Sequence, residues 1–227
     1  MTSKEAARLI DISAVQTRHS LEDIISLVET AKQYRFINVH TLPCWTGVLS
    51  ELLRDCPDIY VGAPVGFPSG GHTTAVKLLE AEQLLKDGVQ EMDIVMNVGK
   101  LVNRDFNYVA DELELIIRLA GNKALTKVII ELNCLDDREA RDAASLVMDS
   151  GAAFLKTGTG WVKGGANVER IALLKSHVKD RIKIKAAGGI RTWQEFEALL
   201  SLGVERFGIN AQSAVGIAQH YEGMGQA

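Results

Sequence analysis

The sequence is poor in cysteine, and the few cysteines it has are badly spaced for joint chemistry. Cys44, Cys56 and Cys134 are scattered through 227 residues without a CxxC motif or a nearby group of histidines. This spacing argues against a disulfide framework and against a zinc site. We therefore expect a protein of the reducing cytoplasm that holds no metal.

The sequence also has no excess of basic residues and no long apolar run. The 25 Lys and Arg and 29 Asp and Glu residues give a formal net charge of -4, whereas nucleic acid or an anionic membrane attracts a densely basic surface. No stretch approaches the roughly 18 apolar residues that cross a bilayer, and the polar N-terminal segment has no signal-peptide core. We expect neither nucleic acid nor membrane as a partner, and any anionic ligand must be held locally.

Short apolar runs alternate with amphipathic stretches along the whole chain. Hydrophobic residues make up 47% and charged residues 24%, as in soluble proteins that bury a full core. Helical spacing of apolar residues marks Leu21–Tyr34, Ala75–Lys86 and Phe106–Ala120. We predict eight strands, over Leu9–Ile12, Ile37–His40, Ile59–Val65, Met92–Asn97, Lys127–Leu132, Ala153–Thr157, Ile182–Ala186 and Arg206–Asn210.

Residues that start and stop helices separate these runs. Ser20 with Asp23 three residues later is typical of a helix N-cap, and Gly88, Gly151 and Gly203 stand where helix C-caps belong. Eightfold strand–helix alternation has two common solutions, an open doubly wound sheet or a closed barrel. The count and the length favour an α/β fold of the (β/α)8 TIM barrel type, with residues 1–227 as a single domain. Active sites of such barrels lie at the carboxyl ends of the strands.

Two lysines end consecutive predicted strands, each just before a glycine-rich turn. Lys156 precedes Thr-Gly-Thr-Gly, and Lys185 stands about 29 residues later before Gly188 and Gly189. Parallel neighbouring strands bring both lysines to one rim, where two ammonium groups repel each other. Loss of a proton from one of them relieves this repulsion and creates a nucleophilic amine.

Strand alternation places the lysines and an aspartate on the inner face of the barrel. Lys156 points opposite Leu155, and Asp93 lies between outward-facing neighbours. Lys183 shares the inner face with Lys185 and is expected to plug the barrel floor. The alternatives are a solvated rim lysine and an Asp93 that only forms a salt bridge. The last inward residues of the strands include Asp11, His40, Asp93, Glu131 or Asn133, Lys156, Lys185 and Asn210.

The glycine turns at residues 157–160 and 188–189 offer backbone N–H groups to a phosphate or an oxyanion. In barrels of this type a phosphate commonly binds near the loops after strands seven and eight. His40 is expected to be a hydrogen-bonded histidine of the core rather than a ligand. Trp161 follows Gly160 closely enough to wall a pocket.

The chain resembles the deoxyribose-phosphate aldolases of the class I, Schiff-base type. The motifs that carry the resemblance occur in order from about residue 9 to 217. They are Leu9-Ile10-Asp11-Ile12-Ser13, Phe67-Pro68-Ser69-Gly70, Glu91-Met92-Asp93-Ile94-Val95, Val128-Ile129-Ile130-Glu131, Phe154-Leu155-Lys156-Thr157-Gly158-Thr159-Gly160 and Lys185-Ala186-Ala187-Gly188-Gly189-Ile190-Arg191.

The resemblance implies reversible cleavage of 2-deoxy-D-ribose 5-phosphate to acetaldehyde and glyceraldehyde 3-phosphate. By this resemblance Lys156 forms the Schiff base with the substrate. Lys185 perturbs the pKa of Lys156 and shuttles protons, and Asp93 assists the proton transfer. No metal or organic cofactor is needed, because the iminium is the electron sink. We expect small sugar-phosphate or aldehyde substrates, and association of identical chains remains open. Expected substrate contacts are Asp11, Thr157, Gly158, Gly160, Gly188, Gly189 and Asn210.

The chain departs from the family pattern mainly at the phosphate end. Asn210-Ala211 replaces two serines, Gly158 replaces a serine, and Trp161 stands where some members have lysine. His40 replaces a cysteine that is common on strand two. These differences keep two alternatives open: a related Schiff-base aldolase with another, non-phosphorylated substrate, and a sugar-phosphate-binding barrel without catalysis.

Overall fold

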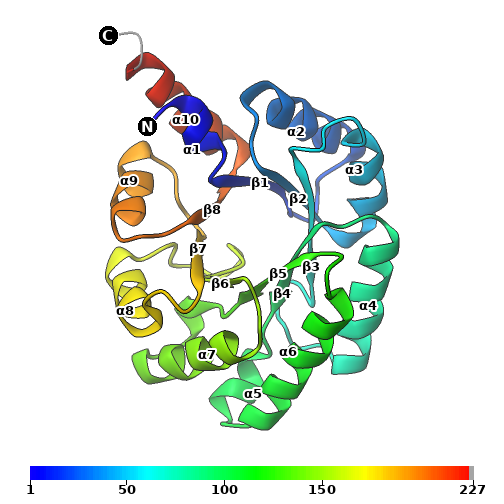
Figure 1. The fold of residues 1–227 in the computed structure, drawn as a ribbon, viewed down its shortest axis with the longest axis vertical. Helices are drawn as coiled ribbons and strands as arrows, with labels where there is room; N and C mark the ends of the chain where they lie inside the picture. Colours follow the sequence, from blue (N-terminus) through cyan, green and yellow to red (C-terminus); the bar gives the residue numbers. More distant parts are fainter. Residues whose placement is uncertain (225–227) are drawn as a thin grey trace.

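The computed structural model describes residues 1–224, in which eight parallel strands form a closed barrel surrounded by helices (Figure 1). Each strand pairs with the next along the chain, and β1 closes the ring by pairing with β8. The (β/α)8 prediction is confirmed and the open sheet is excluded. The strands are β1 Ile10–Ala14, β2 Asn38–Thr41, β3 Tyr60–Val65, β4 Glu91–Val95, β5 Leu125–Ile129, β6 Phe154–Lys156, β7 Lys183–Ala187 and β8 Arg206–Asn210.

Helices cover the outside of the barrel, and α1 lies beside α10 (Figure 1). None of the helices in residues 1–224 is long and apolar enough to cross a membrane. The α-helices are α1 Ser3–Ala7, α2 Leu21–Tyr34, α3 Thr46–Leu52, α4 Thr74–Lys86, α5 Val98–Val102, α6 Phe106–Ala120, α7 Asp137–Asp149, α8 Val168–Val178, α9 Trp193–Ser201 and α10 Ala211–Met224, with 3₁₀ turns at Pro43–Trp45 and Leu132–Cys134.

Most element bounds agree with the sequence patterns, and the largest error is at β5. The strand predicted over Lys127–Leu132 ends at Ile129. Glu131 has left-handed backbone angles, with φ 49° and ψ 59°, which cannot continue an extended strand. Glu131 therefore lies in a loop instead of at the inner end of a strand.

The predicted helix signals act as capping groups. Ser20 and Asp23 form a reciprocal capping box at the start of α2, an arrangement whose loss typically costs about 1 kcal/mol. Gly88, Gly151 and Gly203 have φ values of 88°, 83° and 83° directly after helix C-caps. Glycine adopts this left-handed conformation without the strain that a Cβ introduces, so the chain turns sharply into the following strand.

Strand alternation divides the barrel into an apolar outer layer and a polar interior. Met92, Ile94, Leu155 and Ile184 are fully buried in one core cluster with the helix residues. Full burial of each such side chain contributes about 1.5–3 kcal/mol. Their neighbours in sequence, such as Asp93, point to the interior, and the apolar layer therefore fixes which residues face the barrel axis.

A buried ion pair between α4 and α6 supports the end of β4. The ammonium group of Lys77 lies 2.5 Å from Glu112 Oε1 and donates to the carbonyl of Val95 at 2.9 Å, and both charged side chains are inaccessible to solvent. The Lys77 side chain also runs against Gly66, where an added Cβ would stand 2.7 Å from Lys77 Cε. The pair thus links two outer helices to the strand that carries Asp93.

Candidate active site

A cavity of about 140 Å³ lies at the carboxyl ends of the strands. Of the predicted catalytic residues, Lys156 and Lys185 line it and Asp93 does not. The predicted substrate-contact residues that line it are Asp11, Gly160, Gly188, Gly189 and Asn210. Thr157 and Gly158 are not among its lining residues. His40, Phe67 and Arg191 also line the cavity, which is therefore built from loops and strand ends distant in the sequence.

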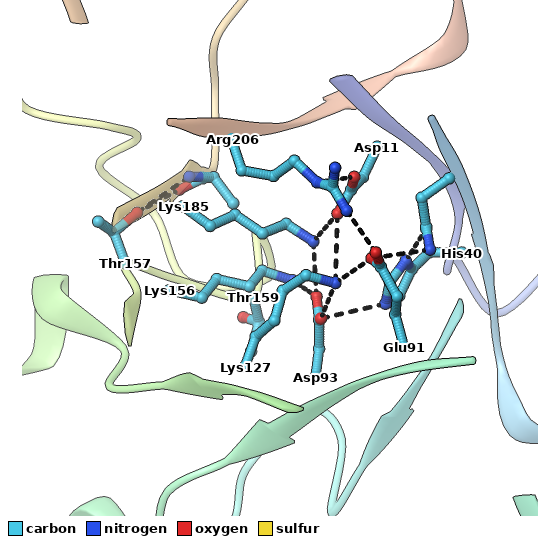
Figure 2. A network of polar contacts seen from close by, with 12 residues as sticks. Asp11, His40, Glu91, Asp93, Lys127, Lys156, Thr157, Thr159, Lys185 and Arg206 are labelled. Atoms are coloured by element: carbon cyan, nitrogen blue, oxygen red, sulfur yellow. Dashed lines mark hydrogen bonds and ion pairs between the residues drawn. The ribbon is translucent and has the colours of Figure 1, made fainter. Parts of the chain in front are cut away.

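Lys156 and Lys185 meet at one carboxylate. Each places Nζ 2.8 Å from Oδ2 of Asp93, which is inaccessible to solvent (Figure 2). The register of β6 and β7 pairs the two lysines directly, and that of β4 and β5 pairs Asp93 with Lys127. The sequence placed both lysines correctly at one rim, but the carboxylate lies between them and offsets much of their repulsion.

A second layer of charged groups lies around this carboxylate and was not predicted as part of the site. Lys127 Nζ lies 3.2 Å from Asp93 Oδ1 and also binds Glu91 (Figure 2). Arg206 binds Glu91, and its Nε lies 2.7 Å from Asp11 Oδ1. Alternation contains the missing signal, because Glu91 lies two residues before Asp93 and therefore shares its inner face.

Basic groups outnumber acidic groups in this buried network. Three carboxylates, Asp11, Glu91 and Asp93, face four basic side chains, Lys127, Lys156, Lys185 and Arg206. Full ionisation therefore leaves one positive charge in excess, and release of one proton balances these groups. A buried unbalanced charge is costly, so the arrangement favours a neutral amine in the network.

The pKa shifts separate the two inner lysines. Burial lowers the pKa of Lys185 to about 8, although Asp11 and Asp93 oppose this shift. Burial also opposes charge on Lys127, but Asp93, Glu91 and Asp11 together outweigh it and raise the pKa of Lys127 above its ordinary value. Lys127 is therefore a permanent cation, and Lys185 is a group that exchanges a proton near neutral pH.

The carboxylates of the network are held in their ionised form. Burial favours neutral Asp93, but His40 and the three lysines around it together outweigh burial and hold the pKa of Asp93 well below its ordinary value. Asp11 follows the same pattern: Lys185, Lys127 and Arg206 overcome the effect of burial and lower its pKa. Asp11 therefore contacts Lys185, at 2.5 Å, as an anion at the wall of the cavity.

Thr157 and Gly158 shape the turn after β6 instead of lining the cavity. Thr157 Oγ1 donates to the carbonyl of Ala187 at 3.1 Å and accepts from its N–H at 3.0 Å, which ties β6 to β7. A Cβ on Gly158 would stand 2.8 Å from Glu131 Oε1. Glu131 in turn accepts the backbone N–H of Thr159. The sequence indicated an important turn, but it did not show that Thr157 and Gly158 stabilise this turn without lining the cavity.

The glycines predicted for anion binding do reach the cavity. Gly160, Gly188 and Gly189 line it with φ values of 81°, 99° and 79°, a backbone conformation that side chains disfavour. Asn210 lines it as well, but its amide oxygen accepts the N–H of Ser213 at the start of α10. The glycine turns and Arg191 are therefore the groups most available to an anion.

Trp161 joins two loops at the mouth. Its indole Nε1 donates to the carbonyl of Val15 at 3.2 Å, and its ring meets that of Phe67 edge to face at 5.7 Å. Val15 and Phe67 line the cavity, so Trp161 stabilises the wall from outside. Lys183, by contrast, is exposed at the start of β7 and lies over the ring of Phe154, apart from the network.

The residues that the structure describes contain no group of three or more His, Cys, Asp or Glu side chains arranged to hold a metal ion. The chemistry available at the mouth is that of amines, carboxylates, one imidazole and backbone N–H groups. A buried amine in contact with a carboxylate, beside a cavity with anion-binding turns, suits attack on a carbonyl of a small anionic substrate.

Comparison with known proteins identifies relatives along almost the whole chain, although no family model matches it. Deoxyribose-phosphate aldolase of Sinorhizobium medicae is 44% identical over 96% of this chain and 88% of its own. The solved structure of "QR15, an Aldolase" is 31% identical, covers 98% of both chains and superposes with a TM-score of 0.91.

A second solved structure carries the same name as the Sinorhizobium medicae protein. A tetrameric deoxyribose phosphate aldolase from Aeropyrum pernix is 27% identical, covers 98% of this chain and 93% of its own, and has a TM-score of 0.88. The barrel, its rim of lysines and the extent of these matches agree with the resemblance carried by the sequence motifs, and the chain belongs to the deoxyribose-phosphate aldolase family.

Proposed function

We propose that this chain is a class I aldolase, an aldehyde-lyase, that reversibly cleaves 2-deoxy-D-ribose 5-phosphate to acetaldehyde and glyceraldehyde 3-phosphate. The observation that carries the proposal is the position of Lys156, which lines the cavity while its Nζ shares Oδ2 of Asp93 with Lys185. The names of the relatives support this substrate and favour neither a non-phosphorylated substrate nor a barrel without catalysis.

In this mechanism Lys156 attacks the sugar aldehyde as a neutral amine. Its proton passes to the neutral form of Lys185 by way of the shared oxygen of Asp93, since both side-chain nitrogens contact that atom. Loss of water from the carbinolamine then gives an iminium ion at C1. Lys185 suits the role of acceptor because its pKa is lowered to about 8, which lets it take and return a proton near neutral pH.

The iminium ion is the electron sink for carbon–carbon cleavage. Removal of the C3 hydroxyl proton forms the C3 carbonyl, the C2–C3 bond breaks, and its electron pair forms an enamine on Lys156. Glyceraldehyde 3-phosphate leaves. Protonation of the enamine at C2 and hydrolysis of the resulting iminium ion release acetaldehyde and restore the free amine.

The phosphate group is assigned to the glycine turns. Gly160, Gly188 and Gly189 reach the cavity, and Arg191 adds a positive charge there. Asn210 serves mainly as a helix cap, so backbone N–H groups carry more of the recognition than side-chain hydroxyls do. Substrate contact by Asp11 is assigned to the sugar end, because Asp11 borders Lys185.

Borohydride trapping tests the Schiff base directly. The protein is incubated with acetaldehyde and sodium borohydride, and peptides are analysed by mass spectrometry. We expect an adduct on Lys156 and loss of cleavage by about a thousandfold or more in Lys156→Met. Lys163→Met is the matched control, since Lys163 is an exposed lysine of the following loop. A wild-type protein without an adduct on Lys156 contradicts the proposal.

A substrate comparison tests the phosphate assignment. We expect kcat/KM for deoxyribose 5-phosphate to exceed that for deoxyribose, and Arg191→Met to reduce this preference. Equal values for the two sugars would favour the non-phosphorylated alternative, whereas the absence of any cleavage with an intact fold would favour a binding protein.

We also propose that identical chains associate, as the tetrameric relative from Aeropyrum pernix does. Exposed apolar side chains on the outer helices support this: Leu21 and Ile25 on α2 and Val76 and Leu79 on α4 are 43–67% exposed. Light scattering after size-exclusion chromatography measures the assembly.

The cytoplasmic location expected from the sequence remains a prediction, with which the free thiols of Cys44, Cys56 and Cys134 agree.

A further inference from the structure

His40 is a buried histidine that lines the cavity and faces Asp93. It is 4% exposed, and its Nε2 lies 3.3 Å from Asp93 Oδ1. Lys156 contacts the other oxygen of this carboxylate, and Figure 2 shows Lys156 and His40 reaching Asp93 from opposite sides. His40 therefore borders the same cavity as the Schiff-base lysine, with the carboxylate between them.

Neighbouring residues fix the tautomer of His40. Asn38 Nδ2 donates to Glu91 Oε2 at 3.0 Å, so the amide oxygen of Asn38 must face Nδ1 of His40 and accept from it. Glu91 also binds Lys127 and Arg206, which makes it an acceptor. The proton of a neutral His40 is consequently on Nδ1, and Nε2 carries a lone pair.

Nε2 and the Asp93 carboxylate then form two acceptors that face each other. Nε2 is a buried atom without a hydrogen-bond partner among the described residues. Burial lowers the pKa of His40 to about 4; repulsion from Lys185 on β7 and Lys127 on β5 adds to this shift, and Asp93 opposes it. Asp11 on β1 adds a further negative charge nearby. At neutral pH Nε2 of His40 therefore lacks a hydrogen-bond donor, and a hydroxyl group of a ligand can supply it.

The backbone leaves room for this histidine. Gly62 on β3 lies opposite His40 in the strand register. A Cβ at Gly62 would stand 2.2 Å from His40 Nδ1 and 2.7 Å from Asn38 Oδ1. The absence of a side chain at residue 62 is thus what permits the Asn38–His40 contact, and the arrangement is built from three strands.

We propose that His40 is a catalytic residue of the cleavage step, in which Nε2 accepts the hydrogen bond and then the proton of the substrate C3 hydroxyl. The C3 oxygen lies further from the imine nitrogen than C2 does, and His40 contacts the oxygen of Asp93 that Lys156 does not. As the proton moves to Nε2, the C3–O bond becomes a carbonyl and the C2–C3 electron pair moves into the enamine. The imidazolium ion pairs with Asp93 and releases its proton to solvent after glyceraldehyde 3-phosphate has left, while the enamine carbon takes its proton from water, so the cycle is balanced.

Asp93 alone is poorly suited to hold this proton. Four groups surround it, and its pKa lies well below the ordinary value. An imidazole beside a carboxylate is a better proton acceptor because the carboxylate stabilises the imidazolium without becoming protonated. His40 therefore takes the proton of the C3 hydroxyl, and Asp93 stabilises the positive charge of the imidazolium ion.

The test separates cleavage from the other steps of the aldolase reaction proposed above, on which this inference rests. Three rates are measured for wild type, His40→Ala and His40→Gln: cleavage of deoxyribose 5-phosphate, borohydride trapping of acetaldehyde on Lys156, and exchange of the acetaldehyde methyl protons in D₂O. Exchange requires the imine and the C2 proton transfer but no C3 hydroxyl. Circular dichroism checks that each variant is folded.

We expect kcat for cleavage to fall about 100-fold or more in His40→Ala, while trapping and exchange stay within about threefold of wild type. His40→Gln keeps an oxygen acceptor but no base, and is expected to retain the KM and lose kcat. Cleavage within about threefold of wild type in both variants overturns the proposal, as does a parallel loss of cleavage and exchange. If wild type itself shows no adduct on Lys156, the proposed function fails instead.

Discussion

Lys156 and Lys185 each place Nζ 2.8 Å from the same atom, Oδ2 of Asp93. One oxygen atom thus links the candidate nucleophile to a lysine whose pKa is lowered to about 8. A proton that moves between the two amines therefore has only one atom to cross.

Replacement of Lys185 should slow imine formation at neutral pH. In Lys185→Leu the neighbouring proton acceptor is lost, and we expect borohydride trapping on Lys156 to slow about tenfold or more at pH 7, the effect of one pKa unit. The rate should recover in part at high pH, where Lys156 loses its proton to solvent. Lys183→Leu, two residues earlier on β7 and exposed, is the control and should trap normally. Equal rates for Lys185→Leu and wild type would remove Lys185 from its role.

Replacement of Asp93 should separate imine formation from turnover. Asp93→Asn keeps the shape of the side chain but removes the charge that Lys127, Lys156 and Lys185 contact. We expect some adduct on Lys156 to remain while kcat falls by about 10²- to 10⁴-fold. Near-normal turnover would mean that Asp93 only forms a salt bridge, the alternative open from the sequence.

Gly62 should tolerate no side chain. Gly62→Ala places a Cβ against His40 and Asn38, and we expect a loss of about 1–3 kcal/mol in the free energy of unfolding, as for an overpacked core, together with slower cleavage. Gly47→Ala is the matched control, because nothing lies within 4 Å of its added Cβ and Gly47 is in helix α3. The control should be unchanged or stabilised by up to about 1 kcal/mol. Urea denaturation and cleavage assays measure both effects.

His40 should make stability depend on pH between its ordinary and its native pKa. The unfolded chain binds a proton at His40 below pH 6.5, whereas the folded protein does so only near pH 4. The free energy of unfolding should therefore fall as the pH decreases through this window, by about 2–3 kcal/mol at pH 4.5 from this residue.

Urea denaturation of wild type and His40→Gln at pH 7 and pH 4.5 measures the difference. The variant should lose less stability between the two pH values. Asp11 and Asp93 have native pKa values below the ordinary 3.8, so the stability they contribute is present above pH 3.8 and is lost only at lower pH. An equal loss in both proteins would show that His40 is charged in the folded state.

Removing one partner of the buried Lys77–Glu112 ion pair should destabilise the protein more than replacing both partners. Lys77→Met leaves Glu112 buried without its cation, and we expect a loss of about 3–5 kcal/mol in the free energy of unfolding. The double variant Lys77→Met with Glu112→Leu removes both charges and should recover most of this loss. A double variant as unstable as the single one would show that the bond of Lys77 to the Val95 carbonyl is the larger contribution.

Alternation along strands explains what could be predicted. It placed Lys156, Lys185 and Asp93 on the inner face at one rim, because period-2 geometry and parallel pairing require it. It could not show which charges meet across the axis. The ionic contacts of Asp11 with Lys127 and Lys185 join strands that are not neighbours in the ring, and those contacts depend on the stagger of the closed sheet.

Loop conformation explains what could not be predicted. Thr157 and Gly158 belong to a conspicuous motif, but only the backbone geometry shows that they contact Ala187 and Glu131 and do not line the cavity. His40 was expected as a hydrogen-bonded core histidine. That reading is correct for Nδ1 and incomplete for Nε2, because the exact direction of a ring atom cannot be obtained from residue spacing.

The closure of the barrel between its first and last strands has a consequence for when the charge network can exist. Asp11 is on β1 and Arg206 is on β8, with their strands paired. Until β8 docks, Asp11 and Glu91 lack their arginine, and the lysines at the rim face an incomplete set of counter-charges. Catalytic competence thus requires the closed ring: a chain with only seven strands in place has its nucleophile but not the electrostatic environment that activates it.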